Sequence, residues 1–311
     1  MPNLKIIYIM GYGRSGSTIL DTILGAHNEV VSVGELSNAP VSCSNPLEYC
    51  ACGRVACSCP FWLSVQEEWC KISGNTGFEK LLTFQQKYER FCNLPYMLCS
   101  RLFMTRSFKE YLRMQQKLYY AIATVSGKHI VVDSSKNPIR ALALSSIPSV
   151  VFLPIHLVRD GRGVVWSLLK SYKQDPKAGL QKEITPRHSW KTTCFWLLTN
   201  FLSELLFWRN RRKKIIRIRY EDLVEHTQET LGVIDSFVGL DYSSVEKKIA
   251  FGKELQVGHT VAGNRTRMLG AIKLKLDHEW EKKLPAKDRR IFWSVAWPLA
   301  IRYGYKRNKL K

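Results

Sequence analysis

The chain has 311 residues, 45% of them hydrophobic and 23% charged, and a formal net charge of +21. This is an ordinary globular composition, and the length allows one large or two small hydrophobic cores. The charge is uneven, because residues 1–160 carry a net charge of +5 and residues 161–311 carry +16. The second half should therefore attract anions such as nucleotides, sulfated or phosphorylated molecules, nucleic acid or acidic lipid.

No segment resembles a secretory signal or a membrane span. The first ten residues lead into an apolar strand without the small residues of a cleavage site. The uncharged run 141–158 contains two prolines, and the apolar run 192–208 is broken by Glu204. We therefore predict a cytoplasmic protein with no integral membrane span. Nine cysteines, an odd number, also argue against a disulfide framework.

Apolar strands and helices alternate along the chain. Strands are predicted at 5–10, 30–33, 129–132, 150–158 and 214–219, and helices at 17–26, after Pro138, and at 163–172, 186–209 and 221–238. Such an alternation indicates a parallel sheet covered on both faces. Residues 38–128 break the pattern with a cysteine cluster and helical stretches at 78–92 and 109–126. We interpret them as a mostly helical insertion within one domain, residues 1–311.

The first loop, residues 11–18 (GYGRSGST), joins the first strand to the first helix. Free backbone N–H groups and the positive end of the helix dipole converge at such a turn, which predicts an anion site. Its spacing is that of the phosphate-binding loop G-x-x-x-x-G-K-[ST], except that Ser17 replaces the lysine. Arg14 is the obvious substitute cation, so the ligand should carry less charge than a triphosphate.

Two segments resemble the sulfotransferases that use 3′-phosphoadenosine 5′-phosphosulfate (PAPS). Residues 14–18 (RSGST) are similar to the family's 5′ loop, [RK]-x-G-[ST]-[ST], and residues 156–167 (HLVRDGRGVVWS) to its 3′-phosphate segment. The resemblance implies a three-layer, P-loop-like α/β fold with a central parallel sheet. It also implies PAPS as sulfuryl donor, its bisphosphate PAP as product, and no metal requirement. Arg159 and Ser167 would grip the 3′-phosphate, for which a guanidinium fork is well suited.

The resemblance extends to candidate catalytic residues. In tyrosyl-protein and several bacterial sulfotransferases a glutamate closely downstream of the loop helix is the general base, and Glu35 follows Arg14 by 21 positions. Lys136 would stabilise the leaving oxygen together with Arg14. The alternatives are a surface role for Glu35, and a helix cap by Ser134 or Ser135 in the turn that carries Lys136.

Two later segments complete the implied nucleotide site. Tyr220 matches a tyrosine that lies against the nucleotide, and the late loop, residues 258–267 (GHTVAGNRTR), would close on the 3′-phosphate side. The full set of candidate nucleotide-binding residues is Gly13, Arg14, Ser15, Gly16, Ser17, Thr18, Arg159, Ser167, Tyr220, Asn264, Arg265 and Arg267. The late loop lacks the R-K-G-x-x-G-x-W-K sequence of the cytosolic eukaryotic branch, so that branch does not inform the choice of acceptor.

The cysteine-rich stretch 43–62 leaves several interpretations open. Cys50, Cys52, Cys57 and Cys59 could form a four-thiolate zinc site. The spacing C-x-C-x4-C-x-C is not the usual pair of C-x2-C knuckles, however. A redox-labile loop that forms a disulfide, or small buried residues near a turn, are the alternatives. The predicted catalytic chemistry uses no metal.

We predict in-line sulfuryl transfer to a hydroxyl or amine of a small molecule, natural product or glycan, with residues 38–128 shaping the acceptor site. Aromatic residues could line a small-molecule pocket, although most belong in a core: Trp62, Trp69, Phe84, Tyr88, Tyr119, Tyr120, Trp190 and Trp196. A Mg²⁺-dependent P-loop kinase with Asp133 as metal ligand is one alternative, which the absent lysine disfavours. A non-catalytic polyanion-binding protein is another, but no nucleic-acid partner is expected.

Overall fold

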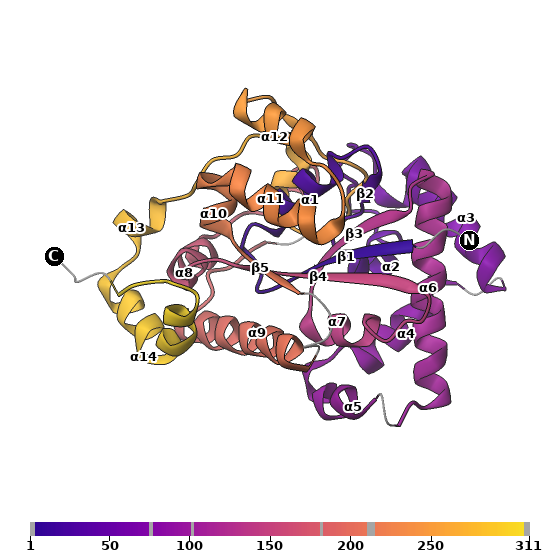
Figure 1. Cartoon of the computed structure of the whole chain (residues 1–311), viewed down its shortest axis with the longest axis horizontal. Coiled ribbons are helices and arrows are strands. Elements are labelled where there is room, and N and C mark those ends of the chain that lie inside the picture. Colours follow the sequence, from indigo (N-terminus) through magenta and orange to yellow (C-terminus); the bar gives the residue numbers. More distant parts are fainter. Residues whose placement is uncertain (1–3, 75–76, 101–102, 181–182, 210–214, 308–311) are drawn as a thin grey trace.

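A parallel sheet forms the centre of the protein, as Figure 1 shows. The computed structural model describes residues 4–74, 77–100, 103–180, 183–209 and 215–307. The central sheet has five strands in the order β2-β3-β1-β4-β5. The strands are β1 (Leu4–Met10), β2 (Val30–Ser32), β3 (Ile130–Lys136), β4 (Val150–Val158) and β5 (Ile216–Arg219). Every neighbouring pair is parallel, which confirms the predicted parallel sheet.

Helices cover both faces of the sheet (Figure 1). One face carries α1 (Ser17–Gly25), α10 (Tyr220–Glu225), α11 (Thr227–Val238) and α12 (Ser243–Ala250), and the other carries α7 (Pro138–Leu144) and α9 (Ser189–Arg209). The side chains of successive β1 residues lie on opposite faces of the sheet. Ile6 and Tyr8 belong to the core under α7 and α9, and Ile7 and Ile9 to the core under α1 and α11. Burial on both faces explains why this strand is continuously apolar.

Residues 38–128 are mostly helical, as predicted. Their α-helices are α2 (Ala39–Ser42), α3 (Pro60–Ser73), α4 (Phe78–Tyr88), α5 (Leu94–Cys99) and α6 (Arg106–Ser126). Trp62 and Trp69 of α3 are fully buried in the same core as alternate residues of β1. Hydrophobic burial therefore attaches this segment to one side of the sheet.

The remaining elements lie toward the C-terminal end of the chain. They are α8 (Gly161–Leu169), α13 (Glu279–Lys283), α14 (Ala286–Arg302), and the short antiparallel strands β6 (Leu255–Gln256) and β7 (Ala271–Ile272). The late loop lies between β6 and β7, and its Val261 forms a parallel bridge with Gly34, just after β2. In the described part of the chain, no helix combines the length and apolar character needed to cross a bilayer.

Several predicted boundaries were wrong, for local reasons. Helix α8 begins at Gly161 rather than 163, because the Asp160 carboxylate accepts a hydrogen bond from the Arg162 N–H and caps the helix. The predicted helix 221–238 is two helices, since the backbone of His226 lies outside the helical range. The start of the strand predicted at 214–219 falls on residues 210–214, which lie outside the described residues.

The turn after β3 also differs from the prediction. The strand runs on through Ser134 and Ser135 to Lys136, so neither serine caps the next helix. Asn137 caps α7 instead, because its side-chain oxygen accepts a hydrogen bond of 2.9 Å from the Ile139 N–H. Lys136 therefore ends a buried strand next to the central strand β1.

Candidate active site

All but two of the sequence-predicted residues, Ser15 and Arg267, line one cavity of about 520 Å³ at the carboxyl ends of the strands. Predicted residues on its wall are Gly13, Arg14, Gly16, Ser17, Thr18, Glu35, Lys136, Arg159, Ser167, Tyr220, Asn264 and Arg265. Among the described residues, its charged wall consists of seven basic side chains (Arg14, Lys136, Arg159, Lys170, Arg265, Lys273 and Lys275) and two acidic ones (Glu35 and Asp277). This excess of positive charge suits a polyanionic ligand.

The first loop offers unused hydrogen-bond donors at the start of α1. Its N-cap residue, Gly16, has φ 90° and supplies no side-chain cap, so the first N–H groups of the helix remain available. A Cβ at Gly16 would lie 2.4 Å from Cδ2 of Tyr220, so only glycine allows this approach. Within the described structure, the buried Ser15 hydroxyl also has no hydrogen-bond partner. These free donors fit an anionic group such as a phosphate or sulfate.

Two arginines join the first loop to the segment after β4. Arg14 Nε donates a hydrogen bond of 3.0 Å to Ser167 Oγ, and Arg159 Nη1 donates one of 3.0 Å to the Arg14 carbonyl. The Arg159 guanidinium also lies 4.6 Å from the ring centre of Tyr220. Burial lowers the pKa of Arg14, and the neighbouring cations Arg265 and Arg159 lower it further. A bound anion would offset this repulsion.

Glu35 and Lys136 form an ion pair on the cavity wall. The Lys136 ammonium contacts Glu35 Oε1, and the Asn38 amide donates a hydrogen bond of 2.9 Å to Glu35 Oε2. Only 16% of the Glu35 side chain is exposed, so it is not the surface glutamate of the alternative interpretation. Lys136 has φ 70°, an uncommon conformation for a non-glycine residue that is often found at functional sites. The late loop packs against the pair, because a Cβ at Gly263 would lie 3.0 Å from Glu35 Oε1.

The three candidates in the late loop separate into two groups. Asn264 and Arg265 line the cavity, and the Arg265 guanidinium lies 4.3 Å from the ring centre of Tyr172. Arg267 is 1% exposed and lies outside the cavity wall. It pairs with the Glu48 carboxylate and donates a hydrogen bond of 3.1 Å to the Tyr49 carbonyl. The structure thus places Arg267 in the packing between the late loop and residues 38–128.

Several lining residues were not predicted: Ile19, Lys170, Tyr172, Thr266, Leu269, Ile272, Lys273, Lys275 and Asp277. Lys170 directly follows α8, with an extended backbone, and comes three positions after Ser167. Lys273 and Lys275 alternate with leucines, a period of two that places lysines on one face of an extended segment. Only the fold shows that this face meets the cavity.

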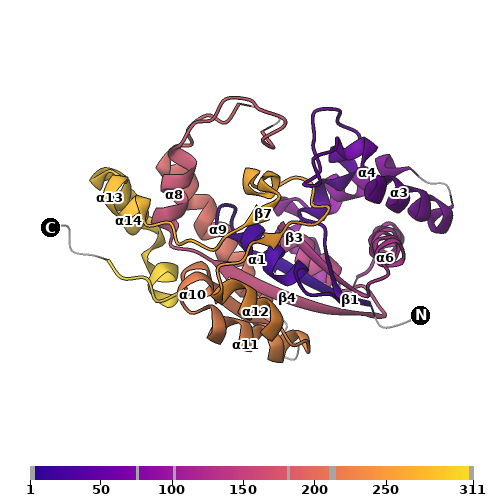
Figure 2. The ribbon, with the colours of Figure 1, turned by 90° about the horizontal axis from the view of Figure 1, so that it is seen from above.

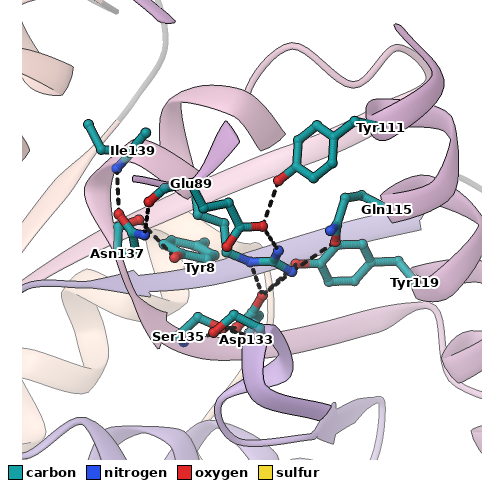
Figure 3. Close-up of polar contacts among 11 residues, drawn as sticks. Tyr8, Glu89, Tyr111, Gln115, Tyr119, Asp133, Ser135, Asn137 and Ile139 are labelled. Carbon is teal, nitrogen blue, oxygen red and sulfur yellow. Dashed lines mark hydrogen bonds and ion pairs between the residues drawn. The ribbon is translucent and has the colours of Figure 1, made fainter. Parts of the chain in front are cut away.

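The end of β3 is held by a buried polar network, shown in Figure 3. Asp133 accepts hydrogen bonds from the Tyr119 hydroxyl at 2.6 Å and from the Ser135 N–H at 2.9 Å, and it pairs with Arg140 at 3.3 Å. Arg140 also contacts Glu89 at 2.5 Å. The Asp133 carboxylate is fully buried and occupied by these partners. It is therefore poorly placed to hold the Mg²⁺ of a kinase.

The cysteine cluster also differs from the set considered in the sequence. The thiols of Cys50, Cys52 and Cys59 lie together, and the fourth potential ligand is His259 of the late loop. Cys57 is exposed and is not a member of this group. His259 lies 200 positions after Cys59, and no local feature of the sequence indicates that it contacts the three cysteines.

Helix α1 contains a buried carboxyl group whose titration should affect stability. Asp21 accepts a hydrogen bond from the Ser32 hydroxyl, and burial raises the pKa of Asp21 to about 7. Between about pH 4 and 7 the folded state keeps a proton that the unfolded state has lost, so the free energy of unfolding falls as pH rises. Above pH 7 the Asp21 carboxyl is ionised in both the folded and the unfolded state, so it no longer makes the free energy of unfolding depend on pH.

The change Asp21→Asn should therefore stabilise the protein near pH 7.5 and have little effect near pH 4. The free energy of unfolding of Asp21→Asn should exceed that of wild type by up to about 4 kcal/mol, because the Asp21 pKa is raised from 3.8 to about 7 and one pKa unit corresponds to about 1.4 kcal/mol. Urea unfolding across this pH range measures it, and Asp175→Asn, at an exposed turn position, is the matched control. A difference between Asp21→Asn and wild type that does not change with pH would contradict the prediction.

An uncapped helix start that faces a cationic cavity is typical of proteins that bind phosphorylated anions. The model of the sulfotransferase domain family matches residues 5–257, which is most of the chain. The chain therefore belongs to the sulfotransferase domain family. Membership makes it a PAPS-dependent sulfotransferase, as the first loop and the segment 156–167 implied.

Solved structures of other sulfotransferases share the fold. The sulfotransferase domain of the Synechococcus PCC 7002 olefin synthase is 17% identical with a TM-score of 0.51, and the similarity covers 99% of this chain and 98% of that one. The sulfotransferase domain from the curacin biosynthetic pathway is 15% identical with a TM-score of 0.52 and 99% of both chains covered. Sulfotransferase STF9 from Mycobacterium avium is 9% identical with a TM-score of 0.52, over 98% of this chain and 78% of that one. Comparison with curated protein sequences gives no match.

Proposed function

We propose that this sulfotransferase moves the sulfuryl group of PAPS to a hydroxyl or amine of a small molecule, natural product or glycan, with Glu35 as the general base. The observation that carries the proposal is the Glu35–Lys136 ion pair on the wall of the cavity that contains the first loop. In one transfer, the base can take the proton of the acceptor while the neighbouring cation stabilises the leaving oxygen of the donor.

The donor would be held by residues from both ends of the cavity. The free N–H groups of residues 13–18 and the hydroxyls of Ser15, Ser17 and Thr18 suit the 5′ phosphosulfate. Arg159 and Ser167, with Asn264 and Arg265 of the late loop, suit the 3′-phosphate. Arg159 is joined to Asp277 at 3.1 Å in the structure, so it would exchange this carboxylate for the phosphate when the nucleotide binds.

PAPS supplies an activated sulfuryl group whose bond to the bridging phosphate oxygen breaks as the bond to the acceptor forms. Glu35 would take the proton of the acceptor hydroxyl or amine as that new bond forms. Lys136 would then leave the Glu35 carboxylate and donate to the oxygen that gains negative charge. Arg14 lies next to the same loop and would offset charge on the transferring group.

A second cavity of about 330 Å³ supports a site for the acceptor. It shares Arg14, Tyr172, Gly263 and Arg265 with the nucleotide cavity, and its wall also includes Asn45, Glu48, Gly179, Leu180 and Ile184. Figure 2 shows the start of residues 38–128 and the segment between α8 and α9 on the same side of the molecule. Residues 38–128 would thus shape one wall of the acceptor site.

The aromatic residues predicted for an acceptor pocket do not line this second cavity. Trp62, Trp69, Tyr88, Tyr119 and Trp196 are buried in hydrophobic cores. The wall of the second cavity combines the polar and charged side chains of Arg14, Asn45, Glu48 and Arg265 with Tyr172, Leu180 and Ile184. Such a mixed wall suits an acceptor that offers both polar groups and some apolar surface, such as a glycan or a hydroxylated natural product.

Calorimetry with PAP and with ATP–Mg²⁺ tests the proposal against the kinase alternative. PAP should bind with a dissociation constant of about micromolar, and ATP–Mg²⁺ at least about tenfold more weakly. Arg159→Ala should weaken PAP binding, and the exposed arginine change Arg113→Ala should not. Micromolar binding of ATP–Mg²⁺ without a response to PAP would overturn the proposal.

Turnover distinguishes the enzyme from a polyanion-binding protein. Conversion of PAPS to PAP should accelerate when a panel of hydroxylated and amino acceptors, including glycans, is supplied. Heparin binding that falls steeply with salt, combined with no PAP formation for any acceptor, would favour the non-catalytic alternative.

A further inference from the structure

The cysteine-rich stretch and the late loop meet in a cluster that the transfer reaction does not use. One ligand atom each from Cys50, Cys52, Cys59 and His259 lies within 4.8 Å of all the others. Cys50 and Cys59 are fully buried. Three sulfurs and an imidazole nitrogen gathered in this way are the usual ligands of a structural zinc ion.

The distances within the cluster match a tetrahedral site. Cys52 Sγ lies 3.6 Å from Cys59 Sγ, and His259 Nδ1 lies 3.4 Å from Cys59 Sγ and 3.9 Å from Cys50 Sγ. Zinc–sulfur bonds of about 2.3 Å and zinc–nitrogen bonds of about 2.0 Å place tetrahedral ligand atoms about 3.5–3.8 Å apart. The observed separations therefore leave room for one ion at the centre.

The local backbone positions the three thiols. Cys50 and Cys52 sit on a tight turn closed by a hydrogen bond of 2.8 Å from the Cys50 N–H to the Arg54 carbonyl, and Gly53 supplies the positive φ of 85° that the turn needs. Cys59 is the N-cap of α3, so the start of this fourteen-residue helix fixes the position of the third thiol.

The histidine is held by contacts independent of any metal. The Phe61 ring stacks on His259 at 4.9 Å, and Trp62 Nε1 donates a hydrogen bond of 2.9 Å to the His259 carbonyl. The Ala51 N–H donates another of 3.0 Å to the Thr260 carbonyl. Residues 50–62 thus hold the late loop through these contacts, which place the His259 imidazole beside the three thiols as a fourth possible ligand.

We propose that Cys50, Cys52, Cys59 and His259 bind one structural Zn²⁺ that fastens the late loop to residues 38–128. Three thiolates and a neutral imidazole satisfy zinc with four protein ligands, and binding releases the protons of the thiols. No position remains for a substrate or an activated water, so the role is structural. The site goes beyond the proposed transfer chemistry and does not depend on it.

Metal analysis of the full-length protein tests the proposal. Protein purified under reducing conditions should contain about one zinc per chain. Cys59→Ser and His259→Asn should lose most of this zinc, and Cys57→Ser should keep it, because Cys57 is exposed and outside the cluster. Equal zinc loss in Cys57→Ser and Cys59→Ser would overturn the assignment of ligands.

Cobalt replacement keeps the test valid if the variants fold poorly. Wild-type protein loaded with Co²⁺ should show thiolate-to-cobalt charge transfer and the intense visible bands of a tetrahedral site. A chelator should lower its thermal midpoint, and zinc but not magnesium should restore it. Wild-type protein that takes up no zinc under reducing conditions, or whose mass shows loss of two hydrogens to a Cys52–Cys59 disulfide, would overturn the proposal.

Discussion

Replacing Glu35 by glutamine should lower kcat about 100- to 10,000-fold, the usual contribution of a positioned general base. Glutamine has nearly the same shape, but Lys136 and Asn38 contact different oxygens of the Glu35 carboxylate, so the single amide oxygen of glutamine can replace only one of these two contacts. The change therefore removes the proton acceptor and the negative charge beside Lys136, while the size and shape of the side chain stay nearly the same. The measurement is the rate of PAP formation with the acceptor that gives the highest turnover.

Binding of PAP separates this catalytic role from a role in nucleotide binding. Glu35 is one of only two acidic side chains on the described wall of a cationic cavity, so its loss should leave PAP affinity unchanged or slightly tighter. Glu29→Gln, at an exposed position before β2, is the matched control and should behave as wild type. A kcat of Glu35→Gln within about threefold of wild type would contradict the role of base.

Replacing Arg140 by methionine should destabilise the protein by about 3–5 kcal/mol, because it leaves the buried carboxylates of Asp133 and Glu89 without their cation. Arg140 is fully buried, and its guanidinium also contacts Gln115 at 2.9 Å and Tyr119 at 3.5 Å. Urea unfolding measures the loss. Arg113→Met, on the exposed side of α6, is the control.

The pH dependence of this loss identifies its cause. Burial already raises the pKa of Glu89, and removing Arg140 should raise it further. The folded state then keeps a proton that the unfolded state loses above its ordinary pKa, so the destabilisation by Arg140→Met should grow as pH rises from about 4.5. A loss of stability that is the same at pH 5 and pH 8 would indicate lost packing rather than unpaired carboxylates.

Much of the fold and of the site could be predicted because their signals are local. Apolar strands followed by helices indicate a parallel sheet, and the carboxyl ends of parallel strands meet at one edge. Each of these parts stands at the carboxyl end of such a strand: the first loop, Glu35, Lys136 and Arg159. Their convergence on one cavity therefore follows from chain order alone. The glycine spacing and the absent lysine at Ser17 also lie within a few consecutive residues.

The position of Arg267 and the break in one predicted helix depend on partners that are distant in the sequence. Arg267 and Arg265 carry the same charge and lie in the same loop. Arg265 lines the cavity, whereas Arg267 forms an ion pair with the buried Glu48 carboxylate and is not on the cavity wall. The helix predicted at 221–238 breaks at His226, although helical periodicity continues across it. Periodicity reports which residues are buried, but not where the chain must turn to bury them.

The sequence by itself determined the class of fold, the phosphate-type loop without a lysine, and the set of charged residues at the strand ends. Those features depend on neighbouring residues and on the fixed geometry of a parallel sheet. Only the tertiary structure decided that Lys136 touches Glu35, that Arg140 is buried among carboxylates, and that His259 completes the group of Cys50, Cys52 and Cys59. Such contacts join positions far apart in the chain, and burial and packing of the whole molecule select them.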